Sequence, residues 1–120
     1  MAEQDLRIRT KDFALRIVKL CDKLPKSRAA DVIARQLLRS GTSVAANYRA
    51  AKRARSKAEF IAKLGIVEEE VDESGFWLEM LVDSEIVKAA LLEDLRSEAE
   101  QLTKIVVASI NTARGGPRRS

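Results

Sequence analysis

Apolar side chains recur at steps of three and four residues along most of the chain, a spacing that places them on one face of an α-helix. The first such stretch runs from about residue 10 to residue 24. It ends before Pro25, because the residue before a proline is pushed out of the helical region. Its apolar face holds Phe13, Ile17, Leu20, Cys21 and Leu24. We predict a helix here, preceded by a flexible N-terminal arm over residues 1–9.

A second helix is predicted over residues 28–54, with Ser27 as its N-cap. Its inner face is rich in small side chains, so it should approach its neighbours closely: Ala30, Ala34, Leu37, Gly41, Val44, Tyr48 and Ala51. Glycine costs about 1 kcal/mol against alanine inside a helix, which makes a break or bend at Gly41 conceivable. We favour one helix, because the apolar spacing keeps its phase through Gly41.

A third helix begins at the segment Ser-Lys-Ala-Glu over residues 56–59, which matches a capping box. Its inner face holds Phe60, Leu64, Val67, Val71, Ser74, Leu78 and Leu81. A neighbouring stripe mixes carboxylates with bulky apolar groups and comprises Ile66, Glu70, Glu73, Trp77 and Met80. Such a mixture favours a subunit interface over a monomer core.

A fourth helix is predicted over residues 88–113, after a turn at residues 83–87. Its inward positions are Leu92, Leu95, Ala99, Leu102 and Val106. Residues 114–120 are predicted to form a disordered basic tail. Because the loops are short, the sequence predicts an all-α fold, an up-down-up-down antiparallel four-helix bundle over residues 10–113.

Composition narrows the possible chemistry. The chain has no histidine, which excludes Ser-His-Asp and Cys-His catalysis and imidazole metal sites. The lone Cys21 cannot form an internal disulfide, which is typical of a reducing, cytoplasmic setting. No apolar run approaches the roughly 20 residues of a membrane span. We therefore expect no enzymatic activity, no cofactor and no membrane association.

Charge is strongly segregated along the chain. Residues 1–57 hold 15 basic and 5 acidic side chains, whereas residues 58–100 hold 3 basic and 13 acidic ones. The last 20 residues hold 4 basic side chains and no acidic one. Such blocks can pair across subunits or can hold a polyanion, and the two uses are compatible.

Arginines share one edge of the second predicted helix, and basic residues continue into the turn beyond it. Guanidinium forks match phosphate geometry, and no aromatic residue is interleaved for base stacking, so any binding should be directed to the nucleic-acid backbone. The residues that we predict to bind are Arg35, Arg39, Arg49, Lys52, Arg53, Arg55 and Lys57. The alternative is a solvated face, or a face that pairs with the acidic third helix.

Two other polar features bear on function. The acidic run at residues 68–73 could hold a divalent cation through carboxylates alone, but ion pairs within or between subunits are the better interpretation, and we predict no metal site. Asn47 lies one position off the inner face of the second helix, where we expect its amide to form a hydrogen bond across helices.

Three ordered motifs resemble the four-helix proteins encoded by intervening sequences within bacterial 23S ribosomal RNA genes. They are Thr-Ser-x-x-Ala-Asn-Tyr-Arg at residues 42–49, Ser-Lys-x-x-Phe-Ile-x-Lys-Leu at 56–64, and Glu-x-x-Glu-x-x-x-Trp-Leu-x-x-Leu at 70–81. The segments at residues 19–25 and 98–102 also resemble that family. The resemblance spans about residues 10–113.

This resemblance implies a bundle that assembles into a homopentameric ring, without an established enzymatic activity. Asn47, Tyr48, Glu70, Glu73 and Trp77 fall at signature positions of the family, with roles that are structural rather than catalytic. The family is also similar to the accessory protein of diversity-generating retroelements, a basic pentamer that partners a reverse transcriptase and binds nucleic acid. Many relatives carry an acidic residue just after the Asn-Tyr-Arg segment, where this chain has Ala50 and Ala51.

Two hypotheses follow from these observations. The first is a non-enzymatic homo-oligomer that binds RNA or DNA backbones through the basic edge of the second helix. The alternative is a protein–protein adaptor or scaffold, such as an accessory partner of a reverse transcriptase, with no direct role toward nucleic acid.

Overall fold

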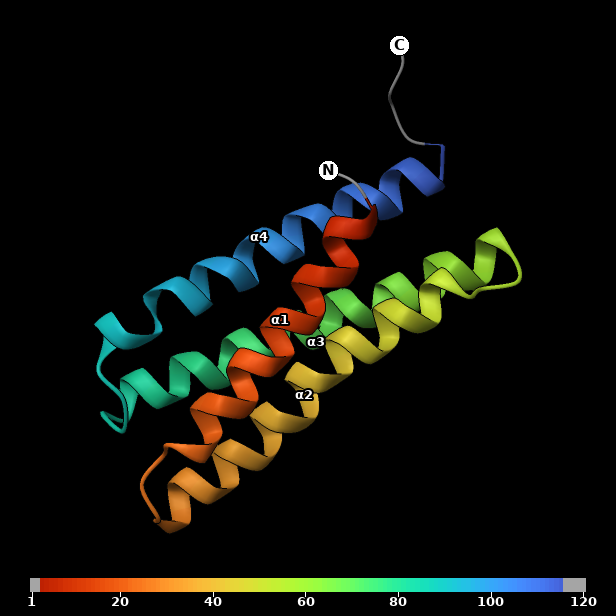
Figure 1. Ribbon diagram of the computed structural model, residues 1–120. Coiled ribbons are helices and arrows are strands. Elements are labelled where there is room, and N and C mark those ends of the chain that lie inside the picture. The colour runs from red at the N-terminus through yellow and green to blue at the C-terminus, as the bar shows by residue number, and fades with distance from the viewer. Residues whose placement is uncertain (1–2, 116–120) are drawn as a thin grey trace.

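The computed structural model describes residues 3–115, with side chains from residue 6 onward, and this part of the chain forms four α-helices and no strand (Figure 1). The helices are α1 (Glu3–Asp22), α2 (Arg28–Lys52), α3 (Lys57–Asp83) and α4 (Ala89–Ala113). The all-α prediction is confirmed. None of these helices combines the length and the apolar character needed to cross a membrane. Residues 116–120 of the predicted tail lie outside the described residues.

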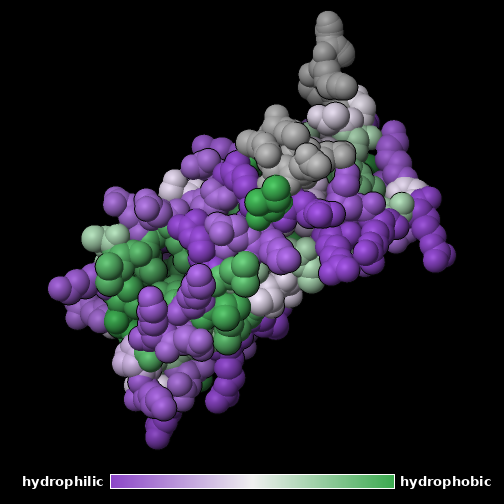
Figure 2. Space-filling view, viewed as in Figure 1, coloured by the Kyte–Doolittle hydropathy of each residue, from purple (hydrophilic) through white to green (hydrophobic). Residues whose placement is uncertain are grey.

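Each helix packs against the next one along the chain, and α1 also meets α4 (Figure 1). One core joins all four helices and includes Phe13, Ile17, Leu37, Tyr48, Leu64, Leu78, Leu102 and Val106. The predicted inner faces of α3 and α4 are confirmed except at Phe60, which is half-buried, and Ile110 extends the face of α4. In Figure 2 the half of the visible face near the α2–α3 turn is mainly hydrophilic, whereas apolar side chains gather toward the opposite end.

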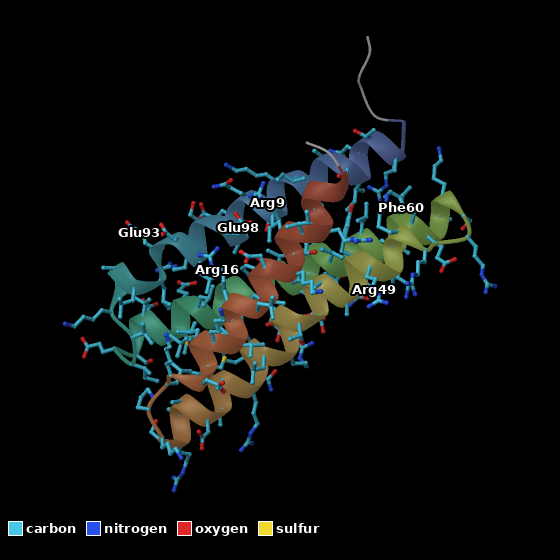
Figure 3. The ribbon with its side chains drawn as sticks, viewed as in Figure 1. Arg9, Arg16, Arg49, Phe60, Glu93 and Glu98 are labelled. Atoms are coloured by element: carbon cyan, nitrogen blue, oxygen red, sulfur yellow. The ribbon has the colours of Figure 1, made fainter. Side chains whose placement is uncertain are left out.

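The predicted N-terminal arm is wrong for residues 3–9, which form the start of α1. Leu6 is buried in the core, and the Arg9 guanidinium forks onto the Glu98 carboxylate of α4 (Figure 3). The two Arg9–Glu98 hydrogen bonds measure 2.9 and 2.7 Å. Because these contacts join residues about 90 positions apart, no local pattern could reveal them. Residues 1–2 lie outside the described part.

α2 runs without a break through Gly41, as we favoured, and the glycine has a role in packing. A β-carbon at this position would lie 2.5 Å from Ile17 Cδ1 and 3.1 Å from Ile17 Cγ2. Glycine therefore serves close packing of α2 against α1, and the helix remains continuous because its backbone hydrogen bonds do not depend on that side chain.

The α3–α4 connection is a Schellman turn. The Ile86 N–H donates to the Leu81 carbonyl and the Glu85 N–H donates to the Val82 carbonyl, each at 3.0 Å. Glu85 has φ 64°, in the left-handed region where glycine is usual. This turn ends α3 sharply and leads directly into α4.

Candidate nucleic-acid interface

The seven predicted basic residues all lie on the surface, along α2, in the α2–α3 turn and at the first residue of α3. Arg35, Arg39, Arg49 and Arg53 follow one another along one edge of α2. At 1.5 Å per residue, this edge extends over roughly 27 Å. Whether it presents a continuous line of positive charge depends on what α3 places beside it.

Arg39 forms ion pairs with the acidic stripe of α3. Its Nη2 atom lies 2.6 Å from Glu73 Oε2, and its Nη1 atom lies 3.2 Å from both carboxylate oxygens of Glu70. The Trp77 indole N–H donates to the same Glu73 oxygen at 3.1 Å. Three signature residues of α3 thus form one network with Arg39, and the pairing of the basic edge with the acidic helix holds at this position.

The pKa values of this network follow from its hydrogen bonds. Two hydrogen bonds raise the pKa of Arg39 above its usual value. The bond to Glu73 has the larger effect, and the bond to Glu70 has the second largest. The pKa of Glu73 is lowered mainly by the hydrogen bond from Arg39 and secondly by the hydrogen bond from Trp77. The two carboxylates compensate the charge of Arg39, so the edge of α2 is interrupted between Arg35 and Arg49.

Arg35 lies exposed beyond Arg39, and four other cations line a surface hollow of about 500 Å³ beside the α2–α3 turn. We call it the basic hollow. Its lining consists of Ala46, Arg49 and Ala50 of α2, Arg53 at the C-cap of α2, Arg55 of the turn, and Glu59 and Lys63 of α3. Figure 3 labels Arg49 on the part of α2 that leads to this turn. Four cations and one carboxylate therefore surround one depression.

The backbone beneath these cations is held by the caps of two helices. The Ser56 hydroxyl accepts a hydrogen bond from the Glu59 N–H at 3.0 Å, as the predicted capping box requires. The Glu59 carboxylate accepts from the N–H of Arg55 at 3.1 Å, one residue before the cap. At the end of α2, the Arg53 N–H donates to the Ala50 carbonyl at 3.0 Å. Arg53 and Arg55 therefore project from ordered backbone.

Lys63 and Glu59 are the charged residues of the hollow that do not belong to the predicted binding set. The sequence carries a signal for them, because antiparallel packing across a short turn brings the first turns of α3 opposite the last turns of α2. Lys52 and Lys57, which were predicted, are exposed nearby but do not line the hollow. The structure thus brings together Arg49, Arg53 and Arg55 of the predicted set.

The signature residues Asn47 and Tyr48 lie on α2 outside the lining of the basic hollow. Tyr48 is buried in the core. The Asn47 amide donates to the Ser43 carbonyl at 2.9 Å within α2, so the expected hydrogen bond across helices is wrong. The buried polar contact between α2 and α3 is made by two serines instead, with Ser74 Oγ donating to Ser40 Oγ at 2.9 Å.

The pKa of Cys21 and the grouping of the carboxylates among the described residues bear on reactive or metal-binding chemistry, and Cys21 is not activated. Burial, together with Asp22, raises the pKa of the Cys21 thiol to about 11, so it is protonated at neutral pH and not an activated nucleophile. Among residues 6–115, no three acidic or cysteine side chains gather as a metal site requires. The chemistry offered by the hollow is electrostatic binding of an anion.

Four packed helices and a basic hollow define a small all-α protein with a localised cationic surface. The family described as 23S rRNA-intervening sequence protein matches residues 3–108, and the chain belongs to this family. A similar solved structure is a protein of unknown function from the S23 ribosomal protein family of Bacteroides thetaiotaomicron. It is 34% identical, with a TM-score of 0.87, and the match covers 92% of this chain and 99% of that one. None of the curated proteins matches this chain. The resemblance seen in the three motifs is confirmed.

Proposed function

We propose that this chain is a non-enzymatic, homo-oligomeric protein that binds the phosphate backbone of RNA or DNA through the basic hollow and the basic side chains around it. The observation that carries this proposal is the convergence of Arg49, Arg53, Arg55 and Lys63 on one hollow. Contacts of arginine and lysine with phosphates supply affinity without reading sequence. The family's reference to an rRNA intervening sequence supports RNA as the first ligand to test.

The proposal includes assembly of up-down-up-down bundles into a homopentameric ring. The number of five is what the family resemblance implies, and assembly as such is supported by the mixed stripe of α3, whose members Ile66, Glu70, Glu73, Trp77 and Met80 are all half-buried. Beside that stripe, Phe76 is 49% exposed and meets the Trp77 ring edge-on at a centroid distance of 4.8 Å. Exposed aromatic groups of this kind are enriched in the cores of protein interfaces. A ring would repeat the basic hollow five times and so convert modest contacts into avidity.

Sedimentation of the nuclease-treated protein with labelled structured RNA tests binding and assembly together. We expect binding at about 50 mM salt that weakens at least tenfold at about 200 mM, because several counterions are released from the RNA. The protein alone should sediment with five times the mass of the 13.3 kDa chain. Absence of binding at the lower salt, or binding indifferent to salt, would contradict the proposed function.

The alternative function is a protein adaptor, such as an accessory partner of a reverse transcriptase. The observation that favours it is the apolar surface remote from the hollow, where Figure 2 shows apolar side chains gathered toward the end opposite the α2–α3 turn. Leu91 at the start of α4 is 74% exposed. In the sedimentation experiment, a defined oligomer without RNA binding would favour this alternative.

A further inference from the structure

The distribution of positive charge differs from that of a surface that follows a strand. A track for a nucleic-acid backbone spaces its cations along the phosphates of successive nucleotides. Here Glu70 and Glu73 compensate Arg39 in the middle of the α2 edge. Of the other arginines on this edge, Arg35 lies by itself beyond Arg39, whereas Arg49 and Arg53 line a single depression together with Arg55 and Lys63.

The cations that line the depression come from several parts of the chain. Ala46 and Ala50 contribute only methyl groups from α2, while the four long basic side chains come from α2, the turn and α3. Arginine provides forked donors that contact two oxygens at once, and lysine provides a point charge. A compact group with several oxygens can therefore be contacted from more than one element.

Resting on the proposed function, we infer that the basic hollow binds the terminal phosphate of a nucleic-acid strand in preference to the diesters within it. A terminal monoester carries about −1.5 to −2 charges at pH 7 and three strong acceptor oxygens. An internal diester carries a single charge and has two such oxygens. Four converging cations therefore gain more from the monoester, whereas cations spaced along a strand would gain little from its end.

Glu59 adjusts the strength of this site. Its carboxylate lines the hollow and is held by the Arg55 N–H, so it lowers the positive potential that a phosphate experiences. The variant Glu59→Gln removes this negative charge and retains a residue that completes a capping box. Glu59→Gln should therefore bind the phosphorylated strand severalfold more tightly while the start of α3 is preserved.

The test compares three forms of one single-stranded RNA of about 12 nucleotides, a length that one site of ordinary size can cover. One form carries a 5′-phosphate, one carries a 3′-phosphate, and one has hydroxyls at both ends. We expect a phosphorylated form to bind about tenfold more tightly than the hydroxyl form, since the extra charge meets several charge-assisted donors that are partly screened by solvent. Arg53→Gln and Lys63→Gln should each reduce this preference, whereas Lys23→Gln/Lys26→Gln, in the α1–α2 loop, should retain it.

Acidity supplies an independent readout. The second pKa of a phosphate monoester is near 6, so lowering the pH from about 7.5 to about 5.2 removes most of its second charge. The hollow itself presents Arg49, Arg53, Arg55, Lys63 and Glu59, and the chain has no histidine that would titrate in this range. The preference should therefore shrink at the lower pH while binding of the hydroxyl form changes little.

The outcomes separate this inference from the proposed function. Equal, salt-sensitive binding of all three RNA forms would overturn the inference and leave backbone binding standing. A preference that survives Arg53→Gln and Lys63→Gln would also overturn it, because the phosphate would then lie elsewhere. Failure of every form to bind would overturn both proposals. Displacement of the phosphorylated RNA by inorganic phosphate at equal concentration would show that the site takes a small ion and not a strand end.

Discussion

At Gly41, the absence of a side chain allows α2 to lie against Ile17 of α1, and this contact occurs in the middle of the core. A β-carbon here would come within 3.3 Å of three Ile17 atoms. Ile17 is fully buried and branched at its own β-carbon, so it can move little to make room. Gly75, in contrast, has no atom within 4 Å of the position that a β-carbon would take.

We predict that Gly41→Ala and Gly75→Ala change stability in opposite directions. Overpacking costs roughly 1–3 kcal/mol and should outweigh the gain in helix propensity of about 1 kcal/mol at position 41. At position 75 no packing cost opposes the gain in helix propensity, so Gly75→Ala should stabilise the protein. Urea unfolding followed by circular dichroism would measure both variants, and a stabilised Gly41→Ala would contradict the packing described here.

The residue scale also shows what the sequence could predict. Ser56 was identified as a cap because its chemistry is local, and the structure confirms its hydrogen bond to Glu59. The partner of Asn47 was not predicted, because a side-chain amide inside a helix can turn back to the carbonyl four residues earlier as readily as it can cross to a neighbour. The Ser40–Ser74 contact was missed because two small hydroxyls have no distinctive pattern.

At the scale of elements, the pairing of α2 with α3 decides which charges are compensated. Arg39 and the two carboxylates face each other because the short turn fixes the register of the two helices. The same register brings Lys63 to the hollow, which the arginine spacing on α2 alone could not predict. The sequence did not predict the start of α1 because its contacts are also distant in sequence. Arg9 donates a hydrogen bond to Glu98 of α4.

We predict that Glu73→Gln destabilises the α2–α3 pair in a pH-dependent manner. Because Arg39 lowers the pKa of Glu73 in the folded protein, the carboxylate contributes stability above its unfolded pKa of about 4.3, and this contribution is lost as the pH falls through the folded pKa. At pH 7 the difference in free energy of unfolding between wild type and variant should be small, because Arg39 and Glu73 are both more than a third exposed. The difference should disappear at acidic pH. Urea midpoints of both proteins between neutral and acidic pH would check this. A difference that is independent of pH would show that the charge of Glu73 is irrelevant to stability.

At the scale of the whole molecule, the two ends differ in character. On the face that Figure 2 shows, the half near the α2–α3 turn, the turn that holds the basic hollow, is mainly hydrophilic, whereas apolar side chains gather toward the other end. The α1–α2 loop lies at the opposite end of α2 from the hollow, roughly 38 Å away along the helix (Figure 1). Its exposed Lys23 and Lys26 therefore provide a control for any effect of overall charge.

Anisotropy titration of labelled RNA against two charge-reversed variants tests the central claim most directly. Arg49→Glu/Arg53→Glu and Lys23→Glu/Lys26→Glu change the net charge of the protein equally, and all four side chains are exposed on the surface. At about 50 mM salt we predict that the first variant loses at least tenfold in affinity with unchanged helix content, while the second remains within about threefold of wild type. Equal losses in both variants would show that net charge governs binding, and unchanged affinity in the first would remove the basic hollow as the binding site.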